Sequence, residues 1–270
     1  MTRIAVIQCS IRQFDPDYNL KKAELWIKRA KRKKADIVVF PEDFLIGPLG
    51  GKLDYADDGR RYKQHFQNLA RTHAVAIVTG SFIEKGAVGL HNTTYFIDKT
   101  GKTKSRYRKI HLWNGERKYL VPGNELSVFN TVYGKIGLVI CWDLAFPELF
   151  RAMTKRGVQI VFCPSFWSYG DAGVGVKYEK NAEVNFVNAL CSARAFENEL
   201  VLVYCNAVGT WNIGKHEGML IGNSQMTVPF KGVLAKLSNK EGMLVADIDL
   251  KILNAAEKSY RIRNDLKLTS

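Results

Sequence analysis

Short apolar runs rich in β-branched residues alternate along the chain with stretches in which apolar residues recur every three or four positions. Runs of this length predict buried strands, and the amphipathic stretches between them predict helices. This alternation is typical of an α/β protein. The apolar runs cover residues 4–7, 37–40, 75–78, 136–140, 159–162, 200–204 and 244–248.

Three stretches have helical periodicity. In the first, apolar residues from Leu20 to Ala30 recur at spacings of three and four while lysines fill the other positions, which predicts one helix with one buried stripe. We expect further helices over residues 59–72 and 177–198. The last is apolar on more than one side, so it is either fully buried or lies at a subunit interface.

Two segments predict antiparallel hairpins rather than parallel strands. Residues 93–97 and 104–107 flank the turn Asp98-Lys99-Thr100-Gly101, and residues 224–228 and 233–236 flank a second turn. Mixed sheets are therefore expected. Because there is no linker rich in Pro, Gly or Ser and no short repeat, we expect residues 1–270 to form a single domain.

The charge balance raises the question of a polyanionic partner. The chain of 270 residues has 40 Lys and Arg against 26 Asp and Glu, for a net charge of +14. However, the densest basic run, residues 28–34, falls where the first helix should end, and cations are favoured there by the helix dipole. A solvated helix end explains the run, so the sequence does not favour nucleic acid as a partner.

The chain has no apolar stretch near the roughly 20 residues that span a bilayer, and its first residues run directly into a predicted strand. Its five cysteines are widely spaced, and most lie in apolar runs rather than in Cys-x-x-Cys pairs. Neither a disulfide framework nor a zinc site is indicated. We therefore expect a soluble cytoplasmic protein with no membrane partner.

A carboxylate follows the second predicted strand. Glu42 comes after Val38–Phe40 and Pro41, which cannot continue the hydrogen-bonded ladder. An acid at the edge of a sheet, in partly apolar surroundings, should have a raised pKa suited to proton transfer. Taken alone, an acidic residue in a loop or at a helix start is the commoner explanation.

A cysteine follows the strand predicted at residues 136–140. We expect the Cys141 thiol to be exposed at the sheet edge, near backbone dipoles that lower its pKa, as a nucleophile requires. Inert burial would explain Cys141 alone equally well. Three other cysteines lie within apolar runs, where a thiol acts as a small hydrophobic side chain: Cys163, Cys191 and Cys205.

A basic segment, residues 107–113, ends the first hairpin. A lysine such as Lys109 can stabilise a neighbouring thiolate and a developing oxyanion, and the nearby carboxylate of Glu116 can hold a proton. His111 suggests a Cys–His pair, but no Asn or Asp can be assigned to orient it, and a buried histidine bonded to backbone is the commoner outcome.

Together these pieces resemble, in order and spacing, the nitrilase superfamily of carbon-nitrogen hydrolases. The motifs are Pro-Glu after the second strand, Tyr-Arg-Lys-Ile-His-Leu around Lys109, and Gly-Leu-Val-Ile-Cys-Trp-Asp followed by Phe-Pro-Glu-Leu-Phe-Arg. The resemblance covers nearly the whole chain. It includes Ala195–Asn198, Asn206, Gly209, Gly222–Ser224 and Asp247–Asp249.

The resemblance implies a four-layer α-β-β-α sandwich and a catalytic triad. Glu42 would be the general base, Lys109 would stabilise the oxyanion and the leaving group, and Cys141 would be the nucleophile. Glu116 matches a second, supporting glutamate of the family. The backbone N–H of Trp142 would complete the oxyanion hole.

The family resemblance also implies that the protein uses no metal and no organic cofactor. It implies that the chain associates into a homodimer or higher homo-oligomer through the helices after the cysteine strand.

The proposed residues are sufficient for a complete reaction, whatever the family. A thiolate attacks an amide carbonyl, ammonia or an amine leaves, and water hydrolyses the resulting thioester.

The sequence indicates the substrate class less closely than it indicates the catalytic residues. Asp143 follows Trp142, whereas nitrile-cleaving members resemble Cys-Trp-Glu here, so we expect a small linear amide that is cleaved to carboxylate and ammonia. The alternative is an N-carbamoyl amine or amino-acid amidohydrolase, and a remoter one is a basic binding module that retains the fold. Pro48 follows Gly47 where the family often has tyrosine, so one pocket wall is altered.

Aromatic residues near the predicted strand ends suggest a largely apolar substrate pocket. They are Trp113, Trp142, Phe166 and Trp167, although Phe166 and Trp167 fit core or interface positions equally well. No basic residue is placed by sequence alone to bind a substrate carboxylate. We expect residues 169–175 to form a flexible loop near the mouth, where it could act as a lid.

Overall fold

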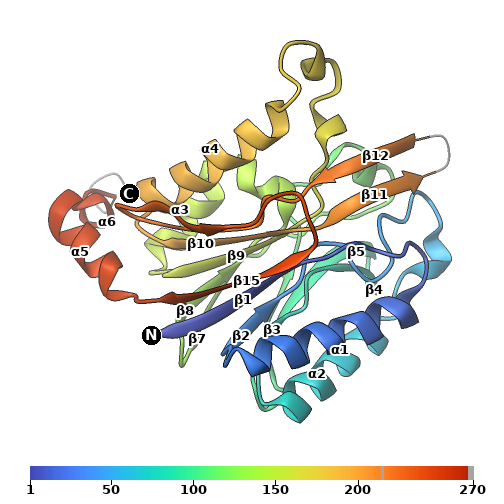
Figure 1. The fold of residues 1–270 in the computed structure, drawn as a ribbon, viewed down its shortest axis with the longest axis horizontal. Coiled ribbons are helices and arrows are strands. Elements are labelled where there is room, and N and C mark those ends of the chain that lie inside the picture. Colours follow the sequence, from blue (N-terminus) through green and yellow to red (C-terminus); the bar gives the residue numbers. More distant parts are fainter. Residues whose placement is uncertain (214–215, 267–270) are drawn as a thin grey trace.

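Two β-sheets pack face to face at the centre of the protein, and helices cover both outer faces (Figure 1). The computed structural model describes residues 1–213 and 216–266. The architecture is the α-β-β-α sandwich with mixed sheets that the sequence predicts.

The first sheet has seven strands in the order β15-β1-β2-β3-β5-β4, and β6 pairs with β5. Strands β1, β2 and β3 are parallel, and the remaining pairs are antiparallel. The predicted hairpin between β5 and β6 is confirmed. The strands span Thr2–Gln8 (β1), Ile37–Val39 (β2), Ala76–Val78 (β3), Phe82–Gly86 (β4), Gly89–Ile97 (β5), Thr103–Arg108 (β6) and Gly242–Ile248 (β15).

The second sheet has six strands in the order β14-β13-β10-β9-β8-β7, with β8, β9 and β10 parallel. The predicted hairpin of β13 and β14 is confirmed. A separate antiparallel pair, β11 and β12, extends beyond this sheet (Figure 1). These strands span Ser127–Thr131 (β7), Gly134–Leu138 (β8), Ile160–Ser165 (β9), Val201–Asn206 (β10), Val208–Ile213 (β11), His216–Ile221 (β12), Gln225–Val228 (β13) and Gly232–Lys236 (β14).

Helices α1 and α2 cover the first sheet, and α3 and α4 cover the second (Figure 1). Short 3₁₀ helices connect several strand ends. The α-helices span Pro16–Arg32 (α1), Arg61–His73 (α2), Pro147–Lys155 (α3), Ala182–Glu197 (α4), Lys251–Tyr260 (α5) and Ile262–Asp265 (α6). The 3₁₀ helices span Leu53–Tyr55 (η1), Asn114–Lys118 (η2), Cys141–Ala145 (η3) and Tyr169–Lys177 (η4).

The inner strands are apolar on both faces because each face meets a different layer. Ile4 and Val6 of β1 pack toward the second sheet, whereas Ala5 and Ile7 pack with the residues of α1 and α2. Successive side chains of a strand point to opposite faces, so a strand in the middle of a four-layer sandwich must be apolar throughout. This explains why the strand signal in the sequence is a continuous run rather than an alternation.

A helix is present within the predicted range 177–198, but it starts later than predicted. The α-helix begins at Ala182, and residues 169–177 form the 3₁₀ helix η4. Helix α4 buries Val187, Cys191 and Ala195 but leaves Phe186 and Phe196 38% and 47% exposed. The two-sided apolar character is therefore real, and the expected homo-oligomer stays a prediction.

All five cysteines are buried and reduced. Within residues 1–213 and 216–266, no helix has the length and apolar character needed to cross a membrane.

Candidate active site

Three strand ends bring the predicted triad to one edge of the sandwich. Glu42 follows β2 and Lys109 follows β6, both of the first sheet, whereas Cys141 follows β8 of the second sheet. All three side chains line the same pocket. The Glu42 N–H donates to the carbonyl oxygen of Ser165 at the end of β9 (3.2 Å), which ties the two sheets together at this edge.

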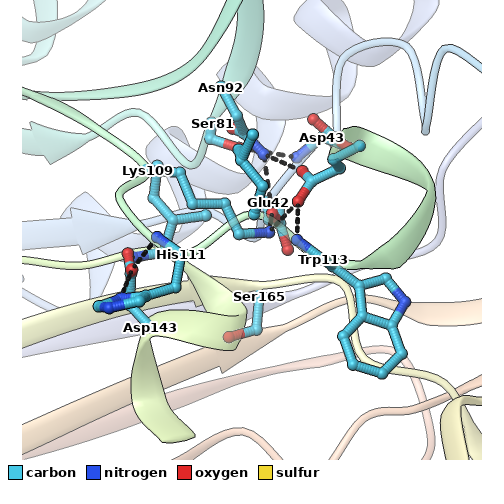
Figure 2. Close-up of polar contacts among 12 residues, drawn as sticks. Glu42, Asp43, Ser81, Asn92, Lys109, His111, Trp113, Asp143 and Ser165 are labelled. Atoms are coloured by element: carbon cyan, nitrogen blue, oxygen red, sulfur yellow. Dashed lines mark hydrogen bonds and ion pairs between the residues drawn. The ribbon is translucent and has the colours of Figure 1, made fainter. Parts of the chain in front are cut away.

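Lys109 lies between two carboxylates (Figure 2). Its Nζ is 2.8 Å from Glu42 Oε1 and 2.8 Å from Glu116 Oε2. Glu116 is held in turn by the backbone N–H of Trp113, which donates to Oε2 over 2.6 Å. The ammonium group is therefore fixed by hydrogen-bonded partners, as a buried charge requires.

Burial and neighbouring charges set the protonation of this cluster. Burial raises the pKa of Glu42, and Lys109 only partly offsets that effect. Burial lowers the pKa of Lys109. The negative charges of Glu116 and Glu42 have a larger effect in the other direction and hold that pKa well above its usual value. Lys109 is thus a permanent cation, while Glu42 is a carboxylate of increased basicity.

Cys141 occupies a strained turn at the start of η3. Its φ of 46° lies in the left-handed region, which is uncommon for a residue with a side chain. The prediction of an exposed thiol with a lowered pKa is wrong, because Cys141 is only 7% exposed and its pKa is raised well above the usual value by burial and by Glu42. At rest Cys141 is therefore a neutral thiol beside Glu42.

Asp143 joins the cysteine turn to the lysine segment. Its fully buried carboxylate accepts from Tyr107 Oη (2.7 Å), from the backbone N–H groups of His111 and Ile140 (2.9 Å each), and contacts His111 Nδ1 at 2.8 Å. Asp143 is therefore the acidic partner of His111 that the sequence could not assign (Figure 2). Asp143 positions the backbone on both sides of the pocket.

Replacing Asp143 with alanine is expected to lower the free energy of unfolding by about 3 to 5 kcal/mol, because buried donors on three residues lose their acceptor. Urea unfolding followed by circular dichroism measures the change. Asp54→Ala, at an exposed position, is the control. A loss below about 1 kcal/mol for Asp143→Ala would contradict this role.

Asn92 is a member of the cluster that sequence reasoning missed. Its Nδ2 donates to Glu42 Oε1 and to Glu116 Oε1, at 2.9 Å each, from the middle of β5. The amide therefore bridges the two carboxylates, and it shares the Glu42 Oε1 acceptor with Lys109 Nζ. The only signal in the sequence is the polar run 91–94 within a strand that is otherwise apolar.

The pocket around the cluster is small, with a volume of about 80 Å³. The four aromatic residues named from the sequence all contribute to its wall, and Trp142 packs against Trp113 and Trp167 with ring centroids 4.4 and 5.6 Å apart. Asp171 of η4 also lines the pocket, so residues 169–175 do lie beside it. They are part of the 3₁₀ helix η4 rather than a loop.

Two chain segments bring backbone N–H groups close to the Cys141 sulfur. Trp142 is the second residue of η3, and the first N–H groups of a helix have no acceptor within it. The Phe166 N–H lies close enough to the Cys141 sulfur to lower the thiol pKa, although burial outweighs it. Sequence reasoning did not assign Phe166 this contact.

Comparison with known proteins identifies the same family and the same fold. The family model for carbon-nitrogen hydrolases matches residues 3–258. A 2-oxoglutaramate amidase of Bacillus subtilis is 30% identical over 98% of this chain and 97% of its own length. A carbon-nitrogen hydrolase of Helicobacter pylori superposes with a TM-score of 0.90 at 25% identity, over 98% of this chain and 94% of the other.

An amidase from Nesterenkonia sp. superposes with a TM-score of 0.78 at 26% identity, over 97% of this chain and 96% of the other. That structure is of a Glu-to-Gln mutant whose active-site cysteine carries the acetamide moiety of fluoroacetamide. The present chain belongs to the carbon-nitrogen hydrolase family, within the nitrilase superfamily. It is an enzyme of the amidase type that acts on small molecules.

Proposed function

We propose that the protein hydrolyses a small linear amide to a carboxylate and ammonia through a thioester on Cys141. The observation that supports this most is the meeting of Glu42, Lys109 and Cys141 in one small pocket, although they follow strands of two different sheets. A structural scaffold has no need for a buried ion pair beside a strained, buried thiol.

The first half of the reaction forms the acyl-enzyme. Glu42 accepts the thiol proton as the Cys141 sulfur bonds to the amide carbon, and the carbonyl oxygen becomes an oxyanion. The Lys109 ammonium and the Trp142 N–H stabilise that oxygen. The carbon-nitrogen bond then breaks, Glu42 returns the proton to nitrogen, and ammonia leaves.

The second half of the reaction hydrolyses the thioester. Glu42 accepts a proton from water as the water oxygen bonds to the acyl carbon, and the carboxylic acid leaves as the carbon-sulfur bond breaks. The sulfur regains its proton from Glu42. Glu116 keeps Lys109 charged and in place through both halves, because the two groups are 2.8 Å apart.

The pocket volume limits the substrate. About 80 Å³ is well below the roughly 300 to 1,000 Å³ of pockets that hold drug-sized ligands, so the acyl group should contain only a few heavy atoms. The Nesterenkonia amidase has also been solved with butyramide, which has four carbons. Butyramide is therefore a suitable first substrate.

The charges that line the pocket do not favour the substrate of the Bacillus subtilis relative. That protein is named for 2-oxoglutaramate, an amide that also carries a carboxylate. Among the described residues that line the present pocket, the one basic side chain is Lys109, and two carboxylates already hold it. We therefore propose a substrate without a carboxylate.

Ammonia release from butyramide, butyronitrile and an N-carbamoyl amine tests the proposal, with Cys141→Ala as the control. We expect release from butyramide that depends on Cys141. Release of carbon dioxide with ammonia, from the carbamoyl compound alone, would replace the amide proposal by the N-carbamoyl alternative. Absence of turnover, together with salt-dependent retention on DNA, would indicate the basic binding module instead.

A further inference from the structure

Asp43 lies in the pocket wall immediately after the proposed base, and the reaction described above does not use it. The residue is 8% exposed. Its backbone is well anchored, because its carbonyl accepts from the N–H groups of Ile46 and Gly47 and its own N–H donates to Ser81 Oγ (Figure 2). Its carboxylate accepts no hydrogen bond and forms no ion pair with any residue that the structure describes.

An unpaired carboxyl group in this position is costly. Burial raises the Asp43 pKa well above its usual value, and the negative charges of Glu42 and Glu116 raise it further. Its φ of 52° lies in the left-handed region, which aspartate adopts more readily than most residues with a side chain. Unpaired polar groups of this kind occur mainly at functional sites, where a ligand supplies the missing partner.

A second carboxyl group, that of Asp171, adds to the acidic character of the pocket wall. Burial raises the pKa of that carboxyl to about 6, while its two oxygens accept from the N–H and Oγ of Ser168. Lys109 is neutralised by Glu42 and Glu116. The pocket is thus acidic although the chain as a whole is basic. Asp43 is the carboxyl group in it that has no hydrogen-bond donor among the described residues.

We propose that the substrate is a small amide whose far end carries an ammonium group, and that Asp43 is the counter-ion of that group. This inference rests on the proposed amidase function and narrows its substrate. An ammonium group supplies both the charge and the N–H donors that Asp43 lacks. A carboxylate at the same place would face Asp43, Glu42 and Glu116 without a free cation.

Three substrates of nearly equal size test the inference. β-Alaninamide replaces the terminal methyl of butyramide with an ammonium group, and succinamate carries a carboxylate instead. We expect the kcat/KM of β-alaninamide to be about tenfold or more above that of butyramide. The kcat/KM of β-alaninamide should also be about a hundredfold or more above that of succinamate. In Asp43→Asn the ratio of β-alaninamide to butyramide should fall about tenfold. Asparagine tolerates the same backbone conformation, so the turn is retained.

Asp54→Asn, at an exposed position, is the matched control and should keep the wild-type ratio. Calorimetric binding of β-alaninamide and butyramide to Cys141→Ala gives a readout that needs no turnover, and we expect tighter binding of β-alaninamide there. Equal or better use of butyramide by the wild type would overturn the inference, as would an unchanged ratio in folded Asp43→Asn. Loss of Cys141-dependent release from all three amides would instead refute the proposed function.

Discussion

Cys141→Ala is expected to lower kcat/KM by about 10⁴-fold or more while the protein stays folded. The covalent route depends on a sulfur nucleophile, and no other described cysteine lines the pocket. Cys141→Ser should be similarly inactive, because the hydroxyl is a much weaker nucleophile beside a carboxylate base. Ammonia release measures the loss, and circular dichroism with thermal unfolding shows that the fold is retained.

Cys163→Ala is the matched control. Cys163 is completely buried in β9, where its thiol contacts Ser165 and the backbone N–H of Cys141 but does not line the pocket. Its replacement should lower stability by about 1 to 2 kcal/mol and leave most of the activity. Equal activity in the wild type and in Cys141→Ala would rule out the thioester mechanism.

Glu42→Gln is expected to halt the reaction after the first half. An activated ester, such as a p-nitrophenyl ester of a short acid, has a leaving group that needs no proton. The thiol proton can pass to water, so the ester can acylate Cys141 slowly without the base. Water attack on the thioester needs the base, and its removal should slow hydrolysis by about 10² to 10⁴-fold. We expect one equivalent of p-nitrophenol and a lasting mass increase of one acyl group in intact-protein mass spectrometry.

The variant should fold, because Lys109 keeps its contact with Glu116 and the amide retains a hydrogen-bonding oxygen. Glu125→Gln, which changes an exposed residue, controls for the loss of one negative charge. Steady turnover of the ester by Glu42→Gln at the wild-type rate would show that another group acts as the base.

The sequence predicts the architecture well because the layers leave a clear pattern. Continuous apolar runs identify strands that are covered on both faces, and turn residues identify the hairpins of β5 with β6 and of β13 with β14. The motifs around residues 42, 109 and 141 identify the family, which the comparisons then establish. The roles of the individual residues stay predictions.

The missed features share one physical origin, which is contact between segments that lie far apart along the chain. The burial of Cys141 and the partners of Asp143 depend on contacts between segments more than 30 residues apart. Asn92 reaches two carboxylates that are 50 and 24 residues away along the chain. Local spacing carries no information on such contacts, and the same is true of the unpaired carboxylate of Asp43.

The distribution of the triad over two sheets has a consequence for the apolar layer between them. Glu42 and Lys109 move with the first sheet, and Cys141 moves with the second. In the proposed mechanism a relative slip of about 1 Å misaligns Glu42 and the Cys141 sulfur, and such an error can cost about 10²-fold in rate. The hydrophobic interior therefore acts as an alignment element of the catalyst, and repacking it can impair turnover while the melting temperature stays the same.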